Sequence, residues 1–285
     1  RCTSSAASDV YKRQNQYRYR LFLYLSVILW LLPLIAIMLV SLRSLSDLNA
    51  GNYWGIPTEL NFFENYSEVF VRSPMATYFL NSLIITIPTT IITLIISSMS
   101  GFTLAIHKFK FNMFIFAMFI AGNFIPFQIL LVPVRSITIQ FGMYDTWYAL
   151  IIFHVAFQSG FCTFFLRNFI KELPFELIEA ARADGATEVY IYTKIIIPLM
   201  RPALAALGVL IFTFIWNDYF WALVLVQSDS VRPVTVGLQA LRGQWVASWN
   251  LIAAGSIVCA LPPVIMFFIL QKQFIRGLTF GAVKG

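Results

Sequence analysis

Stretches without a single charged residue recur along this 285-residue chain, separated by short segments that carry the charges. The six longest stretches that lack Asp, Glu, Lys and Arg cover residues 21–42, 73–107, 111–134, 146–166, 202–217 and 243–271. Roughly 20 apolar residues in a helix cross a bilayer core about 30 Å thick. The pattern therefore predicts an all-α membrane protein.

The fifth stretch is short, but apolar residues resume after Asp218 and continue to Ser228. A single helix that carries one internal acid accounts for both parts. We therefore expect one transmembrane domain over residues 15–285. Its six transmembrane helices are expected at residues 21–42, 79–106, 111–134, 146–166, 202–228 and 250–271.

The composition excludes a soluble globular protein. Hydrophobic residues make up 59% of the chain and charged residues 12%, whereas soluble domains contain about 25% charged residues. A net charge of +7 would also suit a protein that binds nucleic acid, but in so apolar a chain it is better explained by unequal placement of basic residues across a membrane. We expect no nucleic-acid partner.

The basic residues predict the orientation of the chain, because six spans put both termini on the same side. Five basic residues fall on the opposite side, namely Arg43, Arg72, Arg135, Arg232 and Arg242. Twelve fall on the side of the termini, namely Arg18, Arg20, Lys108, Lys110, Arg167, Lys171, Arg182, Lys194, Arg201, Lys272, Arg276 and Lys284. Since basic residues favour the cytoplasmic side, both termini and the long loop between spans four and five are expected there.

The first 14 residues differ in character from the rest of the chain, and their segment DVYKRQ resembles the translation of a transposon end used in sequencing libraries. We expect residues 1–14 to be a non-native, adapter-derived segment. Cys162 and Cys259 lie inside apolar runs, and His154 has no second ligand residue at suitable spacing in its span. No metal site and no catalytic residue are therefore expected.

The loop between spans four and five, residues 172–200, is neither rich in Gly and Ser nor plainly polar. It predicts two short helices. The first would start near Pro174 and end at Gly185, which can adopt the left-handed conformation. The second would start at Thr187, and Pro198 and Pro202 would break the chain before it re-enters the bilayer.

This loop also carries a spaced motif that begins at Glu179 and ends at Pro198: Glu-Ala-Ala, three residues, Gly, nine residues, Ile, one residue, Ile-Pro. The motif resembles the EAA signature of the permease subunits of ABC importers, with Ile197 where that family usually has Leu. Segments such as LNFFENYSEVF and FIWNDYFWALVL extend the resemblance to the maltose-type carbohydrate branch.

The resemblance implies a type I importer permease fold in a bacterial inner membrane, forming half of the translocation pathway for a carbohydrate. It implies a second permease, a dimer of ATP-binding subunits and an extracytoplasmic solute-binding protein as partners. ATP and Mg²⁺ would be used by those ATP-binding subunits, because this sequence has no glycine-rich loop that could hold phosphates. The resemblance also indicates that the tail, residues 276–285, could reach the interface with the ATPase.

By the same resemblance, the EAA helix would lie in a cleft of the ATPase subunit and transmit its closure. The residues expected to carry this coupling are Glu179, Ala180, Ala181, Arg182, Asp184 and Gly185.

Asp218 is the one acid well inside an expected span, and intramembrane acids usually face a cavity or a partner. Trp216, Asn217 and Asp218 could line the substrate pathway, or Asp218 could make a structural hydrogen bond to another helix. One alternative function is a six-span transporter or facilitator driven by an ion gradient. Such a protein would need no EAA loop and would usually carry several intramembrane ionisable groups.

Overall fold

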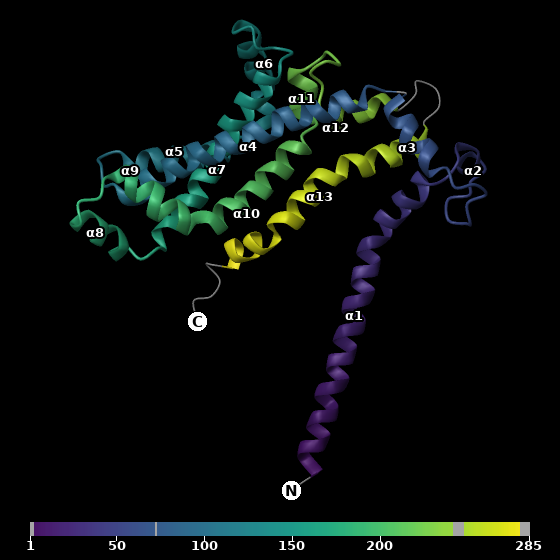
Figure 1. Ribbon diagram of the computed structural model, residues 1–285, viewed down its shortest axis with the longest axis horizontal. Helices are drawn as coiled ribbons and strands as arrows, with labels where there is room; N and C mark the ends of the chain where they lie inside the picture. Colours follow the sequence, from purple (N-terminus) through teal and green to yellow (C-terminus); the bar gives the residue numbers. More distant parts are fainter. Residues whose placement is uncertain (1–2, 72, 242–247, 280–285) are drawn as a thin grey trace. The chain divides into compact units, whose positions relative to one another are not determined.

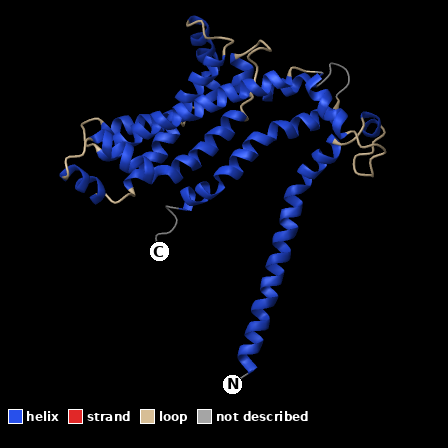
Figure 2. Cartoon of the chain, in the orientation of Figure 1, coloured by secondary structure: helices blue, strands red, loops and turns tan. Residues whose placement is uncertain are grey.

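The computed structural model describes residues 3–71, 73–241 and 248–279, and every regular element among them is a helix (Figures 1 and 2). The prediction of an all-α fold is confirmed. Residues 280–285 of the tail lie outside the described residues, as do Arg72 and Arg242, which entered the count of basic residues.

Five helices are long and apolar enough to cross a membrane: Gln16–Ser41 within α1 (Thr3–Ser41), α4 (Met75–Ile106), α7 (Trp147–Lys171), Glu188–Trp216, and Trp249–Gln273 within α13 (Trp249–Thr279). A bent pair of helices gives a sixth candidate span. The six expected spans are therefore reached only if this bent pair counts as one span.

The chain divides into two compact units. The first comprises Arg1–Arg72 and Leu241–Val258, and the second comprises Ser73–Ala240 and Cys259–Gly285. In the second unit α4 packs along α7, and the helix that ends at Trp216 packs against both. A side chain at Gly101 of α4 would approach the backbone nitrogen of Arg167 to 3.1 Å, so this glycine permits close contact between α4 and α7.

The third expected span, residues 111–134, is not one helix. Helix α5 (Asn112–Gly122) ends before Pro126, and the 3₁₀ turn η1 (Phe127–Leu130) and helix α6 (Leu131–Gln140) continue at an angle of 89°. Proline has no amide hydrogen and disfavours helical geometry in the residue before it, which explains the break.

The fifth expected span, residues 202–228, is also wrong at both ends. The helix starts at Thr187 with α9 (Glu188–Tyr190) and continues through a π-helical segment, η2 (Ile191–Ile196), into α10 (Ile197–Trp216). Pro198 and Pro202 therefore do not break the chain. Pro198 lies in the first turn of α10, directly after the wider π turn, where regular α-helical hydrogen bonds are already interrupted.

Asp218 lies between two helices instead of inside one. It follows the end of α10, and its carboxylate accepts hydrogen bonds from the amides of Trp221 (3.2 Å) and Ala222 (3.0 Å). It thereby caps the short helix α11 (Phe220–Leu225). Its Oδ2 also lies 3.3 Å from Nε2 of His154, a residue of α7 that is 1% exposed. The acid thus satisfies backbone groups that the break would otherwise leave unpaired.

The remaining short helices are α12 (Val234–Gly237) and η3 (Leu238–Leu241), which follow α11. In the first unit α2 (Leu45–Asn49) and α3 (Phe62–Val71) follow α1.

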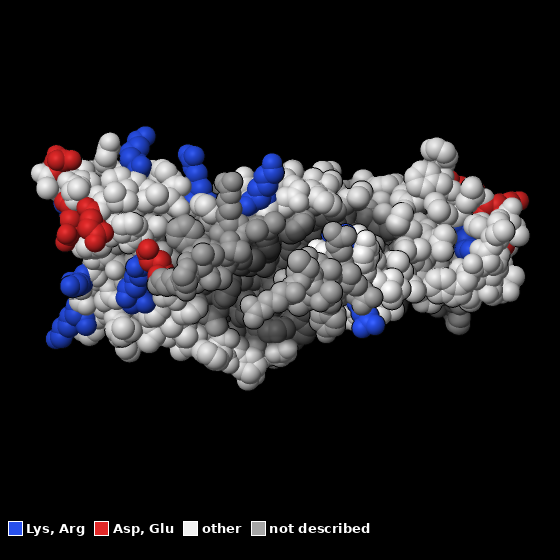
Figure 3. Space-filling view, turned by 90° about the horizontal axis from the view of Figure 1, so that it is seen from below, with Lys and Arg blue, Asp and Glu red and all other residues white. Residues whose placement is uncertain are grey.

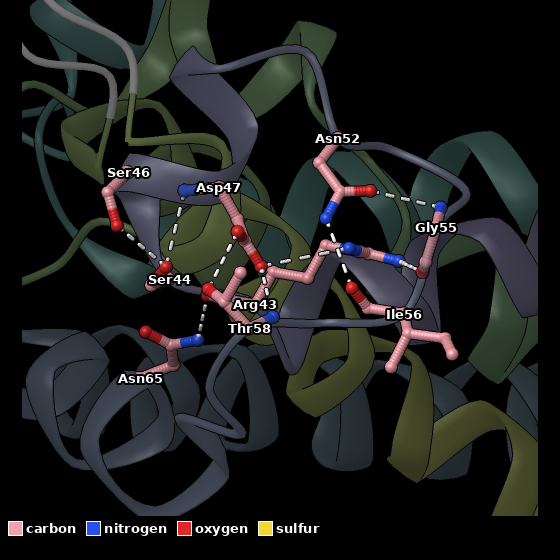
Figure 4. A network of polar contacts seen from close by, with 9 residues as sticks. All are labelled: Arg43, Ser44, Ser46, Asp47, Asn52, Gly55, Ile56, Thr58 and Asn65. Atoms are coloured by element: carbon pink, nitrogen blue, oxygen red, sulfur yellow. Dashed lines mark hydrogen bonds and ion pairs between the residues drawn. The ribbon is translucent and has the colours of Figure 1, made fainter.

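A polar network orders the loop between α1 and α3 (Figure 4). Arg43 is fully buried, and its guanidinium lies 3.8 Å from Asp47 and donates a hydrogen bond to the carbonyl of Gly55. Asp47 accepts two bonds from Thr58, from the amide at 2.9 Å and from the hydroxyl at 2.8 Å. Asn65 of α3 donates to the carbonyl of Arg43 at 2.8 Å. Side chains thus connect both ends of the loop.

Replacing Asp218 by Ala should lower the free energy of unfolding by roughly 1–3 kcal/mol, because it removes the cap of α11 and leaves Nε2 of His154 unpartnered. Thermal unfolding in detergent can be followed by the reaction of buried Cys162 with a thiol dye, with Cys2 and Cys259 replaced by Ser. Asn217→Ala is the matched control, because this exposed side chain bonds only within its own helix. Equal unfolding temperatures for both variants would contradict the capping role.

The loop network should weaken in acid. The hydrogen bonds from the Thr58 amide and hydroxyl, aided by Arg43, hold the pKa of Asp47 below its usual value. The stabilisation is therefore complete above the unfolded-state pKa of about 3.9 and is lost as the pH falls through the lower pKa of the folded state. Hydrogen exchange at residues 53–60, corrected for intrinsic rates, should accelerate only below about pH 4. In Asp47→Asn it should be fast at every pH, and slow exchange in that variant at low pH would refute the explanation.

Candidate functional site

The loop after α7 forms a short exposed helix, α8 (Glu176–Ala183), at the end of the second unit where α4 ends (Figure 1). Glu176 and Glu179 lie in its first turn and Arg182 in its last, the arrangement that the helix dipole favours. Ile178, which is 2% exposed, anchors the helix to the core. Gly185 ends it with φ +80°, as its left-handed preference predicts.

An open groove of about 670 Å³ lies between α8 and the start of the next helix. It is lined by small, polar and aliphatic residues of the two helices and of the turn between them: Leu177, Ala180, Ala181, Asp184, Gly185, Ala186, Thr187, Tyr190, Lys194 and Ile195. Because Ala180 and Gly185 project little or no side chain, the backbone there is open to close approach. The groove can receive a protruding element of another protein.

The structure brings four of the six coupling candidates to this groove, namely Ala180, Ala181, Asp184 and Gly185. Glu179 is exposed outside the groove lining. Arg182 does not line the groove, and its Nε donates a hydrogen bond to Glu188 Oε1 at 2.9 Å. The two helices predicted in this loop are confirmed, but the second one is the start of the span itself.

Sequence reasoning missed several residues of this region. Tyr190 and Lys194 line the groove, and their spacing of four on a helix that starts at Thr187 could have indicated it. Glu188 also contacts His107, the residue that ends α4, with 3.4 Å between Oε2 and Nε2. No local pattern reveals that contact, because the two residues belong to distant segments.

The three pathway candidates have different surroundings. Trp216 is 2% exposed, and its indole N–H donates to the carbonyl of Cys259 at 2.8 Å. Asp218 faces His154 and the amides of α11. Only Asn217 has an exposed side chain, and its amide donates to the carbonyl of Thr213 at 2.8 Å. The partner of Asp218 could not be read from the sequence, because His154 belongs to another helix.

Charged side chains of both signs gather at the end of the second unit that carries α8 (Figure 3). Glu176, Glu179, Arg182 and Asp184 belong to α8 and its C-terminal cap, and all four are exposed. This end of the unit is therefore suited to contact with a water-soluble partner, unlike the apolar faces of the long helices.

Comparison with known proteins identifies the family. The family described as "Binding-protein-dependent transport system inner membrane component" matches residues 94–280. The osmoprotective compounds uptake permease protein GgtD of Synechocystis sp. is 33% identical over 282 residues, which cover 95% of each chain. The arabinooligosaccharides transport system permease protein AraQ of Bacillus subtilis is 32% identical over 267 residues, covering 93% of this chain and 94% of that protein.

A solved structure agrees in fold. The chain superposes, with a TM-score of 0.79 and 23% identity, on a bacterial ABC transporter involved in the import of the acidic polysaccharide alginate. The match covers 92% of this chain and 97% of that one. With the EAA motif on an exposed helix and these relatives, this chain belongs to the binding-protein-dependent permeases, the multi-pass membrane subunits of ABC importers.

Proposed function

We propose that this chain forms half of the translocation pathway of a carbohydrate importer, and that a dimer of separate ATP-binding subunits drives it through α8. The observation that carries the proposal is the exposed helix α8, which ends on left-handed Gly185 beside an open groove and bears the EAA residues. In this proposal α8 lies in a cleft of the ATPase subunit and the wall of that cleft fills the groove, so closure of the cleft when ATP and Mg²⁺ bind to the partner would move α8.

The roles within α8 follow from position. Ala180, Ala181 and Gly185 keep the groove open, while Asp184 at the C-terminal cap offers a carboxylate to the wall of the ATPase cleft. Glu179 supplies an exposed charge beside the groove. Ile178 binds the helix to the core, so that a push on α8 moves the membrane helices behind it.

A second permease is proposed as the neighbour of the N-terminal helix. No residue in the most apolar window of Gln16–Ser41 is buried by this chain, and Trp30 is 82% exposed. This surface suits contact with lipid and with another subunit. The binding protein would deliver solute on the side opposite to α8.

The proposed orientation has both termini and α8 in the cytoplasm of a bacterium, with the chain in the inner membrane. It rests on the excess of twelve basic residues over five. ATP-binding subunits work where ATP is available, so an exposed α8 on the cytoplasmic side agrees with the coupling role.

A carbohydrate is proposed as cargo because one relative is named for the transport of arabinooligosaccharides. Small polar solutes are oriented by a few placed hydrogen-bonding groups. Of the three pathway candidates, Asn217 is the one whose exposed amide is suited to contact solute, whereas Trp216 and Asp218 would shape the wall behind it.

The test compares two glycines in the reconstituted importer. Gly185 and Gly142 both have positive φ, at +80° and +65°, and open space around them. Valine at either position strains the backbone by about 1–2 kcal/mol, but only Gly185 borders the groove. Gly185→Val should lower ATP-driven uptake of an oligosaccharide roughly fivefold or more, and Gly142→Val less than twofold.

Equal effects of the two substitutions would contradict the proposal. Uptake that persists without ATP-binding subunits and follows an imposed ion gradient would instead favour a gradient-driven transporter. A panel of oligosaccharides and small osmoprotectants in the same assay identifies the cargo class.

A further inference from the structure

The carboxylate of Glu188 joins three elements of the second unit. Glu188 is the first residue of α9, where the chain turns back toward the membrane. Its Oε1 accepts a hydrogen bond from Arg182 of α8 at 2.9 Å, and its Oε2 lies 3.4 Å from His107 Nε2 at the end of α4. One side chain therefore bridges the coupling helix, the start of the fifth span and the end of the second span.

The same end of α4 packs directly against the start of the fifth span. Tyr192, in the π-helical segment, places its hydroxyl 2.7 Å from Ser98 and its ring 5.3 Å from that of Phe102. The ring of Phe102 also contacts His107, with 5.7 Å between centroids. The contact of Glu188 with His107 thus continues a row of side-chain contacts between α4 and the start of the fifth span.

The backbone of His107 bonds to Thr103 and Asn112, whereas its ring has few polar contacts. Its Nδ1 is buried and has no hydrogen-bond partner among the described residues. The polar contact of its ring is therefore the one between Nε2 and Glu188. A displacement of Glu188 would act on the end of α4 through this ring.

Movement of α8 acts on the membrane helices through the buried Ile178 and the link to α7, and it has two further routes. One is covalent, from Gly185 through α9 and η2 into α10. The other is the side-chain bridge through Glu188 to α4, which packs along most of α7. Without the bridge, α4 would receive the movement through its packing on η2 and α10, without a polar contact to Glu188.

We propose that Glu188 is a positioning residue that transmits movement of α8 to α4, with Arg182 and His107 as its two partners. This inference rests on the proposed function, in which α8 receives the ATPase subunit. The three side chains are about one-third to one-half exposed, and polar pairs of that kind contribute little to folding stability. The effect is therefore expected in coupling and not in assembly.

The experiment measures solute transported per ATP hydrolysed by the complete importer in proteoliposomes, together with the amount of ATPase subunit retained on purification. Glu188→Ala and His107→Ala should each lower the transport-to-ATP ratio by about 2- to 30-fold, the range for residues within a coupling network. Retention of the ATPase subunit should not change. Lys108→Ala, an exposed neighbour of His107, is the matched control and should leave the ratio unchanged.

Two further variants separate transmission from a merely structural effect. The double variant His107→Ala with Glu188→Ala should be no worse than Glu188→Ala alone, because both substitutions break the same bridge. His107→Arg should keep most of the ratio, since a donor remains at the end of α4. Unchanged ratios in both single variants, or a double variant in which the two reductions multiply, would overturn the inference.

Gly185→Val distinguishes this inference from the proposed function. If Gly185→Val uncouples transport while the Glu188 and His107 variants do not, α8 couples to the ATPase and the bridge to α4 is refuted. If Gly185→Val leaves uptake intact, the coupling role of α8 itself fails.

Discussion

The absence of water from the bilayer core requires every backbone amide and carbonyl there to find a partner within the protein. In the part of the chain that the structure describes, long helices meet that requirement along most of their length, and two interruptions show how it is met where a helix stops. Where α10 ends, Asp218 accepts the free amides of α11 and is itself held against His154. Where the chain bends between α5 and α6, Pro126 removes a donor, and a 3₁₀ turn begins directly after it. Breaks are therefore placed where a specific side chain or turn can support them.

The same requirement explains why the informative residues lie at helix ends. Gly185 and Asp218 occupy positions whose geometry few other residues satisfy, since one ends a helix with a positive φ and the other accepts the amides that start the next helix. The helix α8 combines a buried anchor with an exposed face. It is anchored by Ile178 and open to solvent on its groove face, so it can bind a partner and remain attached to the bundle.

Most of the fold and part of the site could be predicted from the sequence. Charge-free stretches located the long helices, and the pattern of residues 172–200 predicted the helix that the structure shows as α8. The third and fifth spans were wrong, because hydropathy does not show where a helix bends or stops inside an apolar run. Pro126 was the available signal for the bend, while Pro198 was misleading because the π turn before it is not encoded by any simple pattern. The contacts of Glu188 with His107 and of Asp218 with His154 could not be foreseen, since each joins residues of different helices.

The central claim is that α8 is the contact surface for the subunit that hydrolyses ATP. The most direct test places a photo-crosslinking amino acid at Ala180, which lines the groove and is exposed, and the same probe at Glu59, which is exposed in the loop between α1 and α3. In the assembled importer the probe at Ala180 should attach to the ATP-binding subunit, with a yield that changes when ATP is added, and the probe at Glu59 should not. Attachment from Glu59, or none from Ala180, would contradict the account.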